Sequence, residues 1–343
     1  MTVRVTVTSR SGRPLLSAPL QLADSATLAD VKAAIASAKR SLYVSRQRLT
    51  LPAAPGVKRG RAPRDSESVS SLAAEVASFE GEGEGAGAGG AGSEGASEVT
   101  SLPLLFKDLG PQIGYRAVFF WEYFGPALVY AIPYLFPAAV YSVLNDRAVV
   151  AAAAARPHLP VQRLAMAYVA LHYLKREIET FAVHRFSHAT MPIFNLVKNC
   201  SYYWGFSLFL SYSINHPLYT PPPLALTQVA LALAILCQLA NARCHLILAN
   251  LRPAQGPNAT KYVIPRGFWF NSITCANYTA EILGWTLFAI ATASFPAALF
   301  TAAGAGQMAI WAKAKHYRLK KLFDGKEGRE KYPNRWIMLP PFF

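Results

Sequence analysis

The sequence predicts an α-helical polytopic membrane domain of about six transmembrane helices, preceded by a small N-terminal α+β domain. The 343-residue chain is 52% hydrophobic, but its apolar residues are concentrated between positions 117 and 312. Residues 1–100 instead carry charges and include a polar, glycine-rich tract. Long apolar runs are typical of segments that cross a bilayer, which needs about 20 residues per helix. We therefore expect a cytosolic head at 1–110 and a transmembrane domain at 111–343.

The head shows the order β-β-α-β. Alternating residues and a Ser-Gly-Arg-Pro turn predict a hairpin, and Leu28, Val31 and Ile35 form the apolar face of a helix. The expected elements are strands 3–8 and 15–22, helix 28–38, and strands 46–51 and 102–109. Residues 80–98 contain too few large apolar side chains to pack, so they predict a disordered insertion.

The second part contains six apolar segments, several of them shorter than 20 residues, so some spans must be tilted or have other boundaries. They lie at 117–143, 161–183, 200–214, 223–249, 280–294 and 296–312. In the loops expected on one side of the membrane, Arg147 and Arg156 are the only Lys or Arg residues. The opposite loops and the tail are rich in Lys and Arg. This positive-inside asymmetry predicts a multi-pass protein with both termini in the cytosol.

Charge and motifs restrict the partners. The net charge of +15 suits nucleic acid, anionic lipid or a phosphorylated small molecule, and a membrane body favours the last two over nucleic acid. No HExxH motif and no CxxC spacing occur, so no metal is expected. The glycines between 81 and 95 lack the strand–turn–helix context of a dinucleotide fingerprint, which excludes a soluble Rossmann oxidoreductase.

Polar side chains lie within or beside three of the apolar segments, where charge is costly. His172, Lys175 and Glu179 share one helix face; a functional group and an ordinary interfacial ion pair are both compatible with this spacing. Asn241, His245 and Arg252 form a second row. Such donors suit a pyrophosphate or 2′-phosphate, although a solvated helix end gives the same pattern.

The third group, Asn277, Tyr278 and Glu281, lies at the mouth of the fifth apolar segment. Asn277 and Glu281 are spaced i, i+4, so they share a helix face. A helix start among lipid headgroups is the alternative, but it accounts poorly for Glu281 so close to an apolar run. This group therefore favours a functional site.

These motifs carry a family resemblance. The segments "CANYTAEILGW" (275–285), "NLRPAQG" (250–256), "IWAKAKHYRLKKLF" (310–323) and "YPNRWIMLPPFF" (332–343) resemble the C-terminal domain of the steroid 5α-reductase family. "TLADVKAAI" and "QRLTL" in the head resemble a ubiquitin-like fold. "KDLGPQIGYR" (107–116) and "LHYLKREIETFAVHRFSHATMPIFNLVKNC" (171–200) are similar to very-long-chain trans-2-enoyl-CoA reductases.

The resemblance implies NADPH-dependent reduction of the 2,3 double bond of a (very-)long-chain trans-2-enoyl-CoA, the final step of microsomal fatty-acid elongation. It also implies the endoplasmic reticulum membrane and, as partners, the elongase, the ketoacyl-CoA reductase and the hydroxyacyl-CoA dehydratase. The implied catalytic residues are Gln112, Lys175 and Tyr278. The expected cofactor-binding residues are Asn241, His245, Arg252, Lys261, Asn277, Glu281, Lys315 and His316. Leu319 departs from the pattern, because relatives commonly carry Tyr there.

A mechanism follows from these roles. Hydride addition at C3 leaves negative charge on the thioester oxygen, and C2 must then gain a proton. We expect Tyr278 to supply this proton or to hold the enolate oxygen, Lys175 to stabilise the phenolate, and Gln112 to orient the thioester or the nicotinamide amide. The alternatives are a 3-oxo-Δ4 steroid or polyprenol reductase of the same family, a membrane methyltransferase, and a non-enzymatic adaptor.

Overall fold

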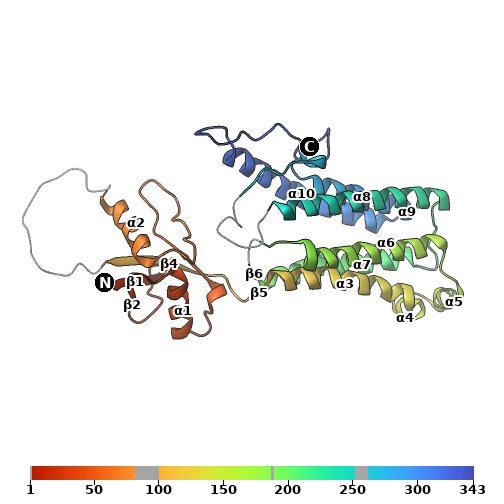
Figure 1. The fold of residues 1–343 in the computed structure, drawn as a ribbon. Helices are drawn as coiled ribbons and strands as arrows, with labels where there is room; N and C mark the ends of the chain where they lie inside the picture. The colour runs from red at the N-terminus through yellow and green to blue at the C-terminus, as the bar shows by residue number, and fades with distance from the viewer. Residues whose placement is uncertain (1, 82–99, 187–188, 252–261) are drawn as a thin grey trace, which may run out of the picture. The chain divides into compact units, whose positions relative to one another are not determined.

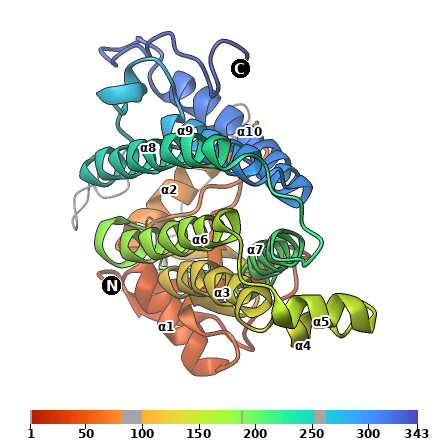
Figure 2. The ribbon, with the colours of Figure 1, turned by 90° about the vertical axis from the view of Figure 1, so that its right-hand side faces the viewer.

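The computed structural model describes residues 2–81, 100–186, 189–251 and 262–343. The chain divides into two compact units, Met1–Ile113 and Gly114–Phe343. Figures 1 and 2 show both units from two directions.

The N-terminal unit is a four-stranded sheet with two helices. The strands are β1 (Thr2–Ser9), β2 (Leu20–Ala23), β3 (Gln47–Thr50) and β4 (Ser101–Asp108), in the order β2-β1-β4-β3. β1 is parallel to β4, and both outer strands are antiparallel to their neighbours. The helices are α1 (Leu28–Ala38) and α2 (Val69–Gly81), with a short 3-10 turn at Val44–Arg46.

Alternation places every second residue of β1 in the core. Val3, Val5 and Val7 are buried and pack with Leu28, Val31 and Ile35 of α1. At the sheet edge, Arg46 donates two hydrogen bonds of 2.6 Å to Asp108, and these bonds lower the pKa of the Asp108 carboxyl below its usual value.

Two features of this unit differ from the sequence prediction. The second strand of the hairpin begins at Leu20 rather than at 15, because Pro14 and Pro19 have no N–H to donate to a ladder. Helix α2 was not predicted, although Val69, Leu72, Ala73 and Val76 repeat at helical spacing and are all buried. The predicted insertion 80–98 overlaps the end of α2, and 82–98 lie outside the described residues.

The C-terminal unit is helical. Its helices are α3 (Tyr115–Leu135), α4 (Pro137–Tyr141), α5 (Arg147–Ala155), α6 (Pro160–Ile178), α7 (Ile193–Ile214), α8 (Leu224–Asn250), α9 (Ala276–Thr292) and α10 (Phe295–Leu322). A π-helical turn, Glu179–Val183, follows α6, and a 3-10 turn, Phe268–Asn271, precedes α9. The short strand β5 (Gln112–Gly114) lies where the two units join in sequence, and β6 (Thr190–Pro192) precedes α7.

All six predicted apolar segments are helical, and the first of them covers both α3 and α4. Among the described residues, α8 is the one helix long and apolar enough by length and composition to cross a membrane. The number of six spans therefore stays a prediction. The expected loop at 144–160 contains the additional helix α5.

The helices pack in two groups that meet around large aromatic side chains. α3 packs against α6 and α7, while α9 lies between α8 and α10, as Figure 2 shows. Tyr168, Trp285, Phe288 and Phe300 form the centre of the core. At Gly125 the backbone of α3 touches the indole of Trp204, because an added Cβ atom would lie 1.9 Å from that ring.

Candidate functional site

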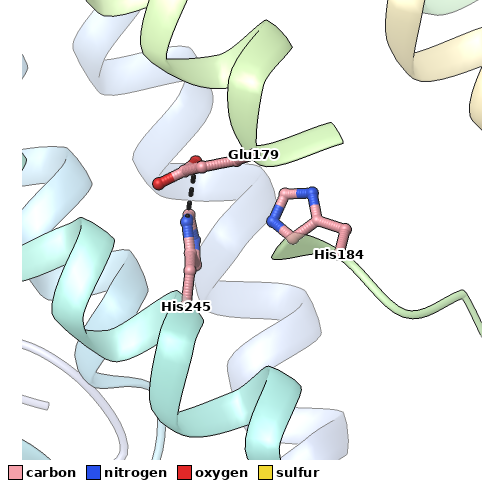
Figure 3. Close-up of side chains that lie close together, drawn as sticks. All are labelled: Glu179, His184 and His245. Atoms are coloured by element: carbon pink, nitrogen blue, oxygen red, sulfur yellow. Dashed lines mark hydrogen bonds and ion pairs between the residues drawn. The ribbon is translucent and has the colours of Figure 1, made fainter. Parts of the chain in front are cut away.

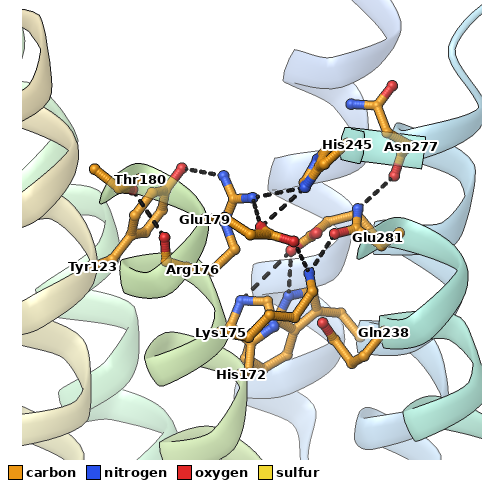
Figure 4. Close-up of polar contacts among 12 residues, drawn as sticks. Tyr123, His172, Lys175, Arg176, Glu179, Thr180, Gln238, His245, Asn277 and Glu281 are labelled. Carbon is orange, nitrogen blue, oxygen red and sulfur yellow. Dashed lines mark hydrogen bonds and ion pairs between the residues drawn. The ribbon is translucent and has the colours of Figure 1, made fainter. Parts of the chain in front are cut away.

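A buried ion network begins on α6. Lys175, Arg176 and Glu179 lie three and four residues apart, so one turn of the helix brings their side chains together. Glu179 accepts a hydrogen bond of 2.6 Å from Nη1 of Arg176, and its other oxygen lies 3.1 Å from Nζ of Lys175 (Figure 4). Glu179 is 4% exposed, so these two cations provide the compensation that a buried carboxylate needs.

The network joins α6 to α3 and α8. Nδ1 of His245, on α8, lies 2.9 Å from Oε2 of Glu179. An ionised carboxylate can only accept and a guanidinium can only donate, and both groups lie beside this nitrogen, because Nη1 of Arg176 is 3.2 Å from it. Arg176 donates to the hydroxyl of Tyr123 at 2.6 Å, and its guanidinium lies 4.5 Å from the centre of that ring.

A second chain of contacts runs from α6 to α9. Nζ of Lys175 donates to Oδ1 of Asn241 at 2.5 Å, and Nδ2 of Asn241 donates to the backbone carbonyl of Asn277 at 2.9 Å. The side-chain oxygen of Asn277 is buried and has no hydrogen-bond partner within the described part of the chain. Three of the predicted site residues, Lys175, Asn241 and Asn277, are therefore linked in a chain of hydrogen bonds. The side-chain oxygen of Asn277 is left as an acceptor at the end of this chain.

Glu281 lies on the side of α9 that faces α6. Its Oε1 accepts a hydrogen bond of 3.1 Å from Trp285 and lies 3.6 Å from Nε2 of the buried His172. The rings of His172 and Trp285 pack edge to face, 4.8 Å apart. Nearby, Gln238 donates to the hydroxyl of Tyr168 at 2.9 Å, and its own oxygen is another buried acceptor without a partner among the described residues.

Glu179, His184 and His245 form a group whose ligand-type atoms lie within 4.8 Å of one another (Figure 3). Two imidazoles and a carboxylate are ligands that zinc accepts. However, Nη1 of Arg176 already lies 2.6 Å from the Glu179 oxygen and 3.2 Å from Nδ1 of His245. A divalent cation at this place would be repelled by the guanidinium and by Lys175, so the ion network accounts for the group. The absence of a metal stays a prediction.

Tyr278 lies on a different face of α9. It packs in an apolar cluster with Cys275, Ile282, Ala312 and Met338, which brings together α9, α10 and the C-terminal segment. Among the described residues, no hydrogen bond or ion pair joins Tyr278 to Lys175. The structure therefore does not provide the direct contact between them that the expected phenolate stabilisation requires.

His316 and Lys315 belong to a separate region on α10. His316 is buried, and its Nδ1 lies 2.7 Å from the hydroxyl of Thr274, which also accepts a hydrogen bond of 3.0 Å from Tyr332. Lys315 is half-buried. Leu319, the departure from the family pattern, is buried against Ile264 and Tyr332, where a hydroxyl would need a polar partner.

The remaining predicted residues are not part of the ion network. Gln112 belongs to the N-terminal unit, where its side chain donates to the carbonyls of Leu109 and Gly110 at 3.1 and 3.2 Å. Arg252 and Lys261 lie outside the described residues. Arg176 and Tyr123 were not among the residues predicted from the sequence. An arginine inside an apolar helix is the signal that could have identified Arg176.

Comparisons with known proteins cover most of the chain. The family model described as 3-oxo-5-alpha-steroid 4-dehydrogenase matches residues 189–343. A Dictyostelium discoideum protein named "Very-long-chain enoyl-CoA reductase" is 45% identical over 239 residues, which cover 70% of this chain and 73% of that protein. A Caenorhabditis elegans protein named "Probable very-long-chain enoyl-CoA reductase" is 43% identical over 245 residues, 70% of this chain and 75% of that protein.

A Mus musculus protein named "Trans-2,3-enoyl-CoA reductase-like" is 35% identical over 228 residues, which cover 65% of this chain and 61% of that protein. The matches to the first two relatives extend across more than two thirds of each of them. The chain belongs to the family of very-long-chain enoyl-CoA reductases.

Proposed function

We propose that this protein reduces the 2,3 double bond of a long-chain trans-2-enoyl-CoA with NADPH and thereby completes a cycle of fatty-acid elongation. The observation that carries the proposal is the 45% identity to the Dictyostelium enzyme over 73% of its length. The buried network around Lys175 and Asn241 supports it. Polar groups inside an apolar helical unit cost free energy, and they typically mark a functional site.

The residues present suit a nicotinamide cofactor. The oxygens of Asn277 and Gln238 are buried acceptors without partners in the described ranges, and a carboxamide –NH₂ group is the complementary donor. We propose that Asn241, His245, Asn277 and Glu281 surround this end of NADPH, and that Lys315 and His316, with Arg252 and Lys261, bind phosphates and ribose. When bound, the cofactor supplies the hydride.

The proton is the contribution that we assign to the protein. The Tyr278 hydroxyl donates it toward C2 of the substrate, or donates a hydrogen bond to the thioester oxygen as negative charge develops there. Lys175 acts on Tyr278 indirectly. It holds Asn241, which in turn holds the carbonyl of Asn277, the residue that immediately precedes Tyr278. The expected role of Gln112 in orienting the thioester or the amide stays a prediction.

We also propose a multi-pass protein of the endoplasmic reticulum with about six spans and cytosolic termini. The helical structure of all six apolar segments, the apolar length of α8 and the positive charge of alternate loops support this topology. The sheet order β2-β1-β4-β3, with a parallel central pair, supports a ubiquitin-like head. Such a head could dock the elongase, the ketoacyl-CoA reductase or the hydroxyacyl-CoA dehydratase.

Purified protein tests the function directly. Consumption of NADPH is measured with trans-2-hexadecenoyl-CoA, a 3-oxo-Δ4 steroid and a polyprenal, and each is repeated with NADH. We expect turnover of the enoyl-CoA with NADPH to exceed that of the other substrates. Preferred reduction of the steroid, which the match of residues 189–343 makes the second candidate, would overturn the proposal. Methyl transfer without NADPH consumption would overturn it as well.

A further inference from the structure

An open groove of about 550 Å³ lies between α9 and α10, separate from the ion network. On α9 it is lined by Ile282, Thr286 and Ala289, in the turn that follows by Ala293, and on α10 mainly by alanines from Ala298 to Ala305. Its volume falls within the range of about 300–1,000 Å³ that small-molecule sites occupy. We call it the α9–α10 groove.

The groove is continuous with the surroundings of Tyr278. Ile282 and Ala305 line the groove and also belong to the apolar cluster that contains Tyr278. Tyr278, Ile282, Thr286 and Ala289 follow one another at spacings of three or four residues, so they form a single stripe along α9, which ends at Thr292 just before Ala293. Tyr278 therefore stands at the head of the groove.

The lining of the groove is mainly apolar, and its three hydroxyl groups are all engaged with the backbone of α9 or α10. The hydroxyl of Thr286 donates to the carbonyl of Ile282, and that of Thr301 donates to the carbonyl of Ala297, both at 2.8 Å. The hydroxyl of Ser294 accepts the N–H of Ala297 and so caps α10. A nucleotide or a headgroup would leave its polar atoms unpaired here, whereas an alkyl chain would not.

We propose that the α9–α10 groove binds the acyl chain of the substrate, and that the turn between α9 and α10 limits the length of chain that fits. This inference rests on the proposed function, because that function supplies a ligand with a reactive thioester end and a long apolar tail. With the reactive carbons near Tyr278, the tail runs along α9 toward Ala293. From Ile282 to Ala293 this path is about 16 Å long at 1.5 Å per residue.

Position along the groove sets the expected order of effects. Ala289 lies closer to Tyr278 along α9, while Ala298 lies in the first turn of α10, near the far end. For each variant we compare kcat/KM for long-chain substrates with kcat/KM for short-chain substrates. In Ala289→Leu this ratio is expected to fall at least tenfold. The longest chain that is still reduced should be shorter in Ala289→Leu than in Ala298→Leu. Ala303→Leu adds the same volume at an exposed position of α10 outside the groove lining and is the matched control.

The measurement is kcat/KM for trans-2-enoyl-CoA substrates from 6 to 24 carbons, with melting temperature as a check on folding. The inference is supported if Ala289→Leu and Ala298→Leu each lose activity above a certain chain length, and if this length is shorter for Ala289→Leu. Ala303→Leu should show no such loss. An equal loss at every chain length, or the same profile in the control, overturns it. It would then follow that the groove does not set the length of acyl chain that the protein accepts.

A binding measurement separates this inference from the proposed function. A saturated long-chain acyl-CoA with a diazirine at its last carbon is cross-linked to the full-length protein, and the labelled peptide is identified by mass spectrometry. Labelling between 289 and 298 is expected. If the protein reduces enoyl-CoA but the label lies elsewhere, the groove assignment fails alone. If the groove is labelled but no enoyl-CoA is reduced, the proposed function fails and the acyl site stands.

Discussion

The Lys175 ammonium lies 2.5 Å from the side-chain oxygen of Asn241, and this contact joins α6 to α8 inside the helical unit. Asn241 passes the connection on to the carbonyl of Asn277 in the first turn of α9. A charged donor that is fixed by a neutral amide keeps its position without losing its charge. The relation therefore gives Lys175 a role in positioning the start of α9, where Tyr278 lies.

Removal of the Lys175 ammonium tests that role. In Lys175→Met the stem is kept, but Asn241 loses its donor and Glu179 loses one of its two cations. We expect kcat to fall on the order of 10²-fold, within the range typical of groups that support proton transfer. Lys175→Arg keeps the charge and should retain more activity. Equal kcat in Lys175→Met and the wild type would remove Lys175 from the mechanism.

Tyr278→Phe removes one hydroxyl and preserves the apolar packing around the ring. We expect turnover to fall by at least about 10²-fold because the proton donor is lost, while NADPH binding, measured by fluorescence titration, is unchanged. Tyr134→Phe is the control, since Tyr134 is also partly buried but stacks on His158 at the C-terminal end of α3. Substantial turnover by Tyr278→Phe would show that another group supplies the proton.

The Arg176–Glu179 pair should behave as a buried ion pair. Arg176→Met leaves Glu179 with Lys175 and His245 only, and truncation of one partner of a buried pair costs about 3–5 kcal/mol of stability. The double variant Arg176→Met/Glu179→Leu no longer buries a carboxylate that has lost its Arg176 partner, so it should be more stable than Arg176→Met alone. Thermal unfolding in detergent gives the comparison. Additive losses would show that the two side chains are energetically independent.

Two glycines of neighbouring helices form a matched pair. A Cβ atom at Gly125 would lie 1.9 Å from the indole of Trp204, whereas one at Gly205 would meet nothing within 4 Å. We expect Gly125→Ala to lower the unfolding free energy by about 1–3 kcal/mol through overpacking. Gly205→Ala should be neutral or slightly stabilising, because alanine favours the helix. Similar melting temperatures for both variants would show that α3 and α7 adjust freely.

The sequence by itself determined the elements with strong periodicity. Helix 28–38 was predicted with the bounds that the structure shows, and each of the six apolar segments is helical. Such features follow from local spacing, because one apolar face or one long apolar run selects a helix regardless of its neighbours. Local spacing also placed His172, Lys175 and Glu179 on one face, although it left their purpose open.

The partners of these side chains were decided by the tertiary structure alone. Spacing along α6 cannot show that Glu179 meets His245, 66 residues later, or that Lys175 meets Asn241 rather than Tyr278. Spacing also cannot show that the two faces of α9 lie in different environments. Glu281 lies beside His172 of α6, whereas the face of Tyr278 continues into an apolar groove. The physical reason is that a helix fixes only which of its residues share a face, whereas the packing of helices fixes what each face meets.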